Sequence, residues 1–157
     1  LSATLFCIHL SLRLIRFGEN PYSFFVLENV IAIANALVFI FINLQLLFRD
    51  NIVNAYRIIG AVNVYLLMAL VGALSLEVIH ATSGVSIGGN VLLSGKDDDY
   101  AQFIYFSLAS LTTVGFGDIH AVNASSRMLA TFLSTVGVLF PAIVIARLVG
   151  LAASQKS

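Results

Sequence analysis

Seven consecutive residues, Thr112 to Asp118, have the types and the order needed to hold a metal cation with main-chain oxygen atoms; they read Thr-Thr-Val-Gly-Phe-Gly-Asp. A cation that enters a narrow passage loses its water, and rings of backbone carbonyls can replace that water. Consecutive carbonyls face one axis only if the backbone alternates between ordinary and left-handed torsions, which glycine adopts without a steric penalty. Gly115 and Gly117 stand at alternate positions. We therefore predict that residues 113–117 present their carbonyls to a shared axis.

The side chains of this stretch have separate expected tasks. Thr113 adds a hydroxyl group at the inner end, while Val114 and Phe116 point away from the axis into the surrounding protein and hold the loop open. A Gly-x-Gly pair alone is also typical of turns and β-bulges. Two threonines before the pair, an aspartate after it, a helical segment upstream and a membrane-length segment downstream favour the cation site over a simple turn.

The composition indicates a membrane protein. Of 157 residues, 59% are hydrophobic and only 10% are charged, and the mean hydropathy of +0.98 lies outside the range of ordinary soluble domains. The formal net charge is zero and no basic residues cluster, so nothing predicts binding to nucleic acid. The single cysteine, Cys7, excludes an internal disulfide and a cysteine-based metal site.

Several apolar segments are long enough to cross a bilayer, which requires roughly 20 residues of helix. Residues 24–48, 56–79 and 125–150 are predicted membrane-spanning helices, because each carries at most two charged residues. Residues 1–17 are a weaker fourth candidate. The Gly/Ser/Asp-rich stretch from His80 to Asp99 is predicted to be a loop.

Residues 100–112 are apolar and helical in character, but they reach only about 20 Å and cannot span. A short helix that enters a membrane and returns as extended chain is tolerated only where its backbone is buried in protein or lines water. We therefore predict a re-entrant helix followed by the cation-binding stretch. The helix dipole would place partial negative charge at the carboxyl end, where a dehydrated cation waits.

This arrangement resembles the pore module of tetrameric potassium channels over residues 56–150. Their signature sequence has tyrosine where this chain has Phe116. The runs 57–67 and 142–150 further resemble a bacterial group of ion channels with extra helices before the pore. The resemblance implies an all-α integral membrane protein with an outer helix, a re-entrant pore helix and filter, and an inner helix. It also implies one or two further transmembrane helices before them, and assembly as a homotetramer with cyclic symmetry.

The function implied by the resemblance is passive, potassium-selective conduction, which is not an enzymatic activity. Residues 1–50 would be N-terminal transmembrane helices of unassigned role and residues 51–157 the pore domain. The partners would be further copies of the chain, potassium ions and membrane lipids, with no cofactor except potassium in the filter. The location would be the cell membrane, as a multi-pass protein of a bacterial inner or plasma membrane. The implied filter is Thr113, Val114, Gly115, Phe116 and Gly117, with potassium bound at the first four.

Three residues are expected to support the filter. Thr112 ends the pore helix, and Asp118 braces the filter by a hydrogen bond to that helix, as the family's aspartate does. The family often places a Glu partner at the position of Ala109, so another residue must take that role here. Tyr105 or Ser110 could do so.

Two further groups have more than one interpretation. Asp97, Asp98 and Asp99 precede the pore helix, where carboxylates cap free amide groups and favour the positive end of the dipole; around a tetrameric mouth they would also raise the local cation concentration. Gly137 and Pro141 weaken one turn of the inner helix, because proline cannot donate to the carbonyl of Gly137. The turn is either a gating hinge or a static kink.

The sequence is also compatible with three other functions. A potassium transporter subunit contains related pore loops, but with one retained glycine and four non-identical repeats in a longer chain. A nonselective cation channel usually lacks part of the filter sequence. A non-conducting membrane scaffold would carry the filter as a relic.

Overall fold

The computed structural model describes residues 25–49, 55–91, 93 and 99–154, and it is mostly helical. Among these residues, three helices are long and apolar enough to cross a membrane: α2 (Phe25–Arg49), α3 (Ala55–Ser83) and α5 (Ala124–Ser154). They agree with the three predicted spans to within four residues at each end. The fourth predicted span, residues 1–17, lies outside the described residues.

Two helices continue four residues past their predicted carboxyl ends: α5 past residue 150 to Ser154, and α3 past residue 79 to Ser83. Gly84 ends the helix with a φ of 77°, and its N–H donates to the carbonyl of His80 at 2.9 Å. This is the left-handed cap that commonly closes helices. The Ser83 hydroxyl donates to the carbonyl of Ile79 at 2.6 Å, so the last turn is hydrogen-bonded despite its polar composition.

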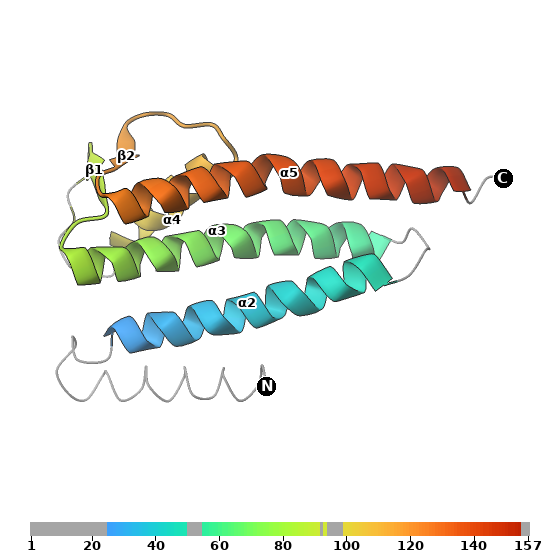
Figure 1. Ribbon diagram of the computed structural model, residues 1–157, viewed down its shortest axis with the longest axis horizontal. Coiled ribbons are helices and arrows are strands. Elements are labelled where there is room, and N and C mark those ends of the chain that lie inside the picture. The colour runs from blue at the N-terminus through green and yellow to red at the C-terminus, as the bar shows by residue number, and fades with distance from the viewer. Residues whose placement is uncertain (1–24, 50–54, 92, 94–98, 155–157) are drawn as a thin grey trace.

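The helix α3 lies between α2 and α5, and the short helix α4 (Asp99–Leu111) packs against α3 and α5 near one end of the bundle (Figure 1). Packing is tight around Gly72 of α3. The Ser107 hydroxyl, fully buried on α4, donates to the carbonyl of Ala69 at 2.7 Å. The Leu133 side chain of α5 also packs next to Gly72, so α3, α4 and α5 are in contact at this glycine.

Gly72→Ala is expected to destabilise the protein. A methyl group there would overlap the Ser107 hydroxyl and lie 2.7 Å from a methyl carbon of Leu133. Overfilling of a packed interior costs about 1–3 kcal/mol. Gly60→Ala is the matched control, because the nearest atom to its methyl group is 3.9 Å away, and alanine favours helix. Thermal unfolding in detergent should show a lower midpoint for Gly72→Ala and an unchanged or higher one for Gly60→Ala; equal midpoints would contradict this account.

Two short strands were not predicted. Strand β1 (Ile87–Gly89) pairs antiparallel with β2 (Ile119–Ala121), with Gly88 opposite His120. Three-residue strands are too short to show an alternating pattern in the sequence. Their pairing connects the segment before α4 to the segment after residues 113–117, which are far apart in the chain.

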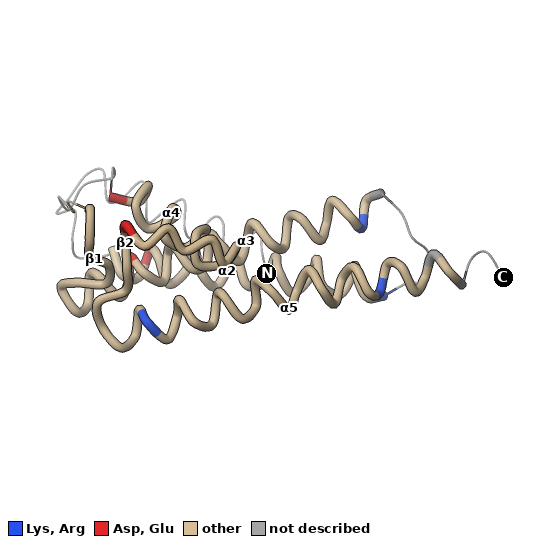
Figure 2. The backbone as a smooth tube through the Cα atoms, turned by 90° about the horizontal axis from the view of Figure 1, so that it is seen from above, with Lys and Arg blue, Asp and Glu red and all other residues tan. Residues whose placement is uncertain are grey.

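The described charges lie towards the two ends of the helical bundle, and the middle is free of them (Figure 2). The acidic residues gather at the end that holds α4 and the strands. A central zone without charge is what a hydrocarbon layer requires of helices that cross it.

Candidate functional site

The short helix α4 ends directly before the predicted cation-binding stretch and so determines where that stretch begins. Its thirteen residues correspond to about 20 Å, and it begins and ends one residue before the predicted range. Asp99 is its first residue, as expected for a carboxylate at the positive end of the helix dipole. Asp97 and Asp98 lie outside the described residues. Phe103, Ser107 and Leu111 are buried against α3 and α5, which fixes the direction in which α4 points.

The carbonyl groups at the carboxyl end of α4 accept hydrogen bonds from the residues that follow the helix. The N–H groups of Thr112, Thr113 and Gly115 donate to the carbonyls of residues 108, 110 and 109, at 2.9, 3.1 and 3.2 Å respectively. The Thr112 hydroxyl also donates to the carbonyl of residue 108 at 2.7 Å. These bonds close α4 with a turn at residues 112 and 113.

Two side chains from the long helices donate further hydrogen bonds to the carbonyls at the end of α4. The Tyr65 hydroxyl of α3 donates to the carbonyl of Leu111 at 3.2 Å, and the Ser134 hydroxyl of α5 donates to that of Ser110 at 2.9 Å. All four terminal carbonyls of α4, which a helix normally leaves open, therefore have donors. Tyr65 and Ser134 were not predicted from the sequence, because their hydroxyl groups contact α4 only through tertiary packing.

The backbone of residues 113–117, here called the filter segment, alternates in handedness. Thr113, Gly115 and Gly117 have φ values of 59°, 54° and 81°, whereas Val114 and Phe116 between them have negative φ. When successive residues alternate between left-handed and right-handed torsions, their N–H groups turn to one side of the chain and their carbonyls to the other. The sequence predicted this alternation from the two glycines and missed Thr113, because a β-branched residue disfavours left-handed torsions.

The left-handed torsion of Thr113 is a strained feature. Such a conformation costs of order 1–3 kcal/mol for a residue other than glycine and is concentrated at functional sites. The bond from its N–H to the carbonyl of Ser110 helps to hold it. The strained residue therefore marks the beginning of the filter segment.

The carbonyl groups from Thr112 to Gly117 accept no hydrogen bond from any residue that the structure describes. The same six residues are all exposed in the single chain. Peptide carbonyls normally have partners when they are withdrawn from water. The last four carbonyls of α4 thus accept hydrogen bonds, whereas the next six carbonyls accept none from the described residues.

Asp118 follows the filter segment and contacts α4. The Tyr105 hydroxyl donates to Oδ2 of Asp118 at 2.7 Å, while Oδ1 accepts from the N–H of Ile119 at 2.9 Å. This hydrogen bond raises the pKa of Tyr105, because the phenol proton is shared with a carboxylate. The Tyr105 ring also stacks on Phe116, with centroids 6.0 Å apart. Tyr105 thus makes the contact for which it and Ser110 were the candidates.

Tyr105→Phe is expected to weaken the hold on Asp118 while preserving the stacking on Phe116. If the filter segment conducts ions, the variant should lose conduction several-fold faster when the permeant ion is depleted, because the strained backbone then loses one of its restraints. Current decay in lipid bilayers measures this. Asp118→Asn is the companion variant: if the pair acts as a unit, the double variant should behave like either single one. Additive effects in the double variant would contradict a shared contact.

Gly137 and Pro141 lie on adjacent turns of α5, which is a continuous helix around the proline. A methyl group on Gly137 would overlap the main-chain carbonyl of Leu111, at the end of α4. Gly137 therefore permits a close approach of two helix backbones, in addition to any flexibility it provides. The gating hinge stays a prediction.

The comparisons with known proteins agree with this architecture. The family described as "Ion channel" matches residues 72–153, more than half of the chain, from the middle of α3 to the end of α5. The search of curated proteins and the search of solved structures gave no match. The matched region contains the carboxyl-terminal part of α3, all of α4, the filter segment and nearly all of α5. The chain therefore belongs to this ion channel family, as a multi-pass membrane protein built for passive ion conduction.

Proposed function

We propose that the protein conducts potassium selectively and passively, through a filter formed by Thr113, Val114, Gly115, Phe116 and Gly117. The observation that carries the proposal is the alternating backbone of this segment, together with carbonyls that accept no hydrogen bond from any described residue. Carbonyl oxygens in successive rings can replace the water of a dehydrated potassium ion. Ions would be held at the level of residues 113–116. The Thr-Val-Gly-Phe-Gly sequence, which resembles the potassium channel signature, favours potassium over other cations.

The proposed assembly is a homotetramer. One chain supplies one filter segment, and a ring of carbonyls needs several copies around an axis. Val114 and Phe116 are 54% and 68% exposed in the single chain, although both are apolar. Along α5, Met128 and Phe132 are exposed in the same way. Apolar side chains beside a membrane-embedded pore are suited to cover by neighbouring copies or by lipid tails.

In this assembly the remaining residues have supporting roles. Thr112 and Tyr105 fix the beginning and the side of the filter, and Asp118 fixes its end. Gly137 and Pro141 would shape the gate. The aspartates 97–99 would lie at the outer mouth, and residues 51–157 would form the pore domain, with residues 1–50 as N-terminal transmembrane helices without an assigned role. No cofactor besides potassium is needed, and the cell membrane is the proposed location.

The decisive experiment uses purified protein in planar lipid bilayers, with potassium on one side and sodium on the other. A potassium-selective channel gives a reversal potential that follows the potassium gradient. A reversal potential near zero would instead indicate a nonselective cation channel, the second candidate. Absence of any current from protein that is folded and tetrameric would overturn the proposal in favour of a transporter subunit that needs a partner, or of a non-conducting scaffold.

A further inference from the structure

The chain just before α4 and the chain just after the filter segment are bound to each other. Strands β1 and β2 pair along three residues, and the N–H of Val122 donates to the carbonyl of Ser86 at 3.0 Å. The side-chain amide of Asn123 donates to the carbonyl of Val85 at 2.6 Å. The exit from the filter segment is therefore attached to a second segment over its whole length, up to the start of α5.

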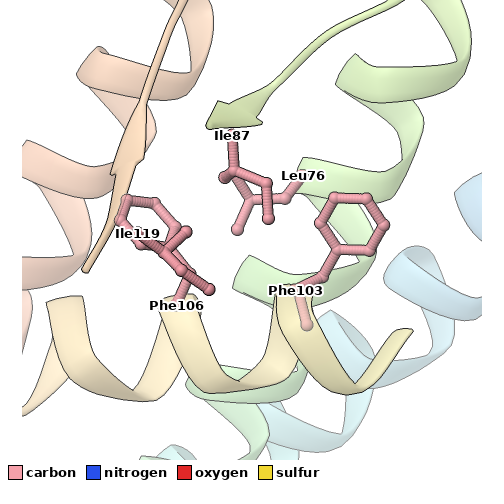
Figure 3. Close-up of a cluster of buried hydrophobic side chains, with 6 residues drawn as sticks. Leu76, Ile87, Phe103, Phe106 and Ile119 are labelled. Carbon is pink, nitrogen blue, oxygen red and sulfur yellow. The ribbon is translucent and has the colours of Figure 1, made fainter. Parts of the chain in front are cut away.

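This attachment is anchored in the interior of the protein. Ile87 of β1 and Ile119 of β2 pack with Leu76 of α3 and with Phe103 and Phe106 of α4 (Figure 3). Ile87 is 2% exposed and Leu76 is fully buried. Because the Ile87 side chain is buried between α3 and α4, β1 is anchored to the interior of the protein.

The support contacts Asp118 directly at the main chain. The N–H of Asn90 donates to the carbonyl oxygen of Asp118 at 2.8 Å. Gly89 approaches the same carbonyl so closely that a methyl group at residue 89 would overlap it and would also lie 3.2 Å from the ring of His120. Gly89 has a φ of 110°, a torsion that few residues other than glycine adopt.

We propose that Gly89 and Asn90 are positioning residues for the filter, acting through the main chain of Asp118. Tyr105 holds the carboxylate of Asp118 from α4, and Asn90, the residue directly after β1, holds its carbonyl from the opposite segment. One residue is thus fixed at two points, directly after Gly117. The inference rests on the proposed function, since its consequence is that β1 sets the spacing of the last carbonyls in the filter.

The test compares Gly89→Ala with Gly84→Ala. Both glycines precede α4 and both have positive φ, at 110° and 77°, but a methyl group on Gly84 meets nothing within 4 Å. Both variants therefore carry a penalty for positive φ, which is larger at 110° than at 77°, and only Gly89→Ala places a methyl group against Asp118. Gly89→Ala is expected to lower the potassium-to-sodium permeability ratio by about tenfold, as distortion of a strained site does, whereas Gly84→Ala should leave the ratio unchanged.

A second pair of variants tests the hydrogen bond from Asn90 to Asp118. In Asn90→Pro a ring carbon takes the place of the hydrogen that points at the Asp118 carbonyl, so the bond is lost and the carbonyl is displaced. Asn90→Ala keeps the N–H while removing the side chain. The permeability ratio should fall for Asn90→Pro and stay at the wild-type value for Asn90→Ala. This pair decides the matter if Gly89→Ala fails to assemble, which size-exclusion chromatography will show.

The outcomes separate this inference from the proposed function. Wild-type protein that passes sodium as readily as potassium contradicts the proposed function. Selective wild-type protein, together with an assembled Gly89→Ala or Asn90→Pro variant of the same selectivity, contradicts only the role of β1.

Discussion

Gly115→Ala is expected to abolish potassium-selective conduction while leaving the fold of each chain intact. Gly115 has a φ of 54°, and a methyl group there meets no atom within 4 Å. The damage is therefore conformational and not steric. A left-handed torsion costs an L-residue about 1–2 kcal/mol, and in the proposed tetramer four filter segments would bear the cost at once, roughly 4–8 kcal/mol in total.

The expected consequence is a turned peptide unit. In the proposed filter, the alternation of Thr113, Gly115 and Gly117 would keep the carbonyls on one side. If residue 115 moves to the ordinary torsion that alanine prefers, its neighbouring carbonyl leaves the common axis and the ion loses a ring of oxygens. Selectivity should fail before stability does, because the filter segment is exposed and contributes little to the buried core.

Bi-ionic reversal potentials in lipid bilayers measure this result, with thermal unfolding as the check on folding. Gly84→Ala is the control, since it has the same open surroundings and a similar positive φ of 77° at a distance from the filter segment. It should conduct as the wild type does. A Gly115→Ala channel that still discriminates potassium from sodium would show that the left-handed backbone at residue 115 is not needed.

The features that follow from local sequence were predictable. The three long helices and the short α4 follow from runs of apolar residues of stated length, and these runs place them within a few residues. The left-handed torsions of Gly115 and Gly117 follow from the properties of glycine. In each case the physical cause lies within the segment itself.

The features that depend on contacts between distant segments were not predictable. The left-handed torsion of Thr113 is held in part by the bond from its N–H to Ser110 of α4, and no pattern around Thr113 signals this. The donors Tyr65 and Ser134 belong to helices whose rotation about their own axes is fixed only by packing. The pairing of β1 with β2 joins segments about thirty residues apart, and a resemblance based on helices gives no indication of it.

The close approach at Gly137 changes how a gating hinge can be tested. A glycine in the middle of an inner helix suggests flexibility, and Gly137→Ala is the obvious variant. In the structure, however, this glycine lies against the carbonyl of Leu111, where the end of α4 meets the filter segment. Loss of activity in that variant would therefore not demonstrate bending. Pro141→Ala leaves the contact intact and is the cleaner test of a hinge.

Gly137→Ala is expected to destabilise the protein and to disturb the filter. The added methyl group would overlap main-chain atoms of Leu111, which cannot rotate away as a side chain can, so α5 must separate from α4. Separation would break the bond from Ser134 to Ser110. Overfilling and the lost hydrogen bond together correspond to about 2–5 kcal/mol. Thermal unfolding and potassium flux in liposomes should both show the loss.

Gly150→Ala is the control for this variant, because it lies in the same helix and its methyl group meets nothing within 4 Å. It should unfold at the wild-type temperature or above. If Gly137→Ala matched it in stability and in selective flux, the close approach to Leu111 would have no role. If stability fell for Gly137→Ala while Pro141→Ala changed only open probability, the two residues would have separate tasks: Gly137 joins the inner helix to the base of the filter, and Pro141 allows its far half to bend.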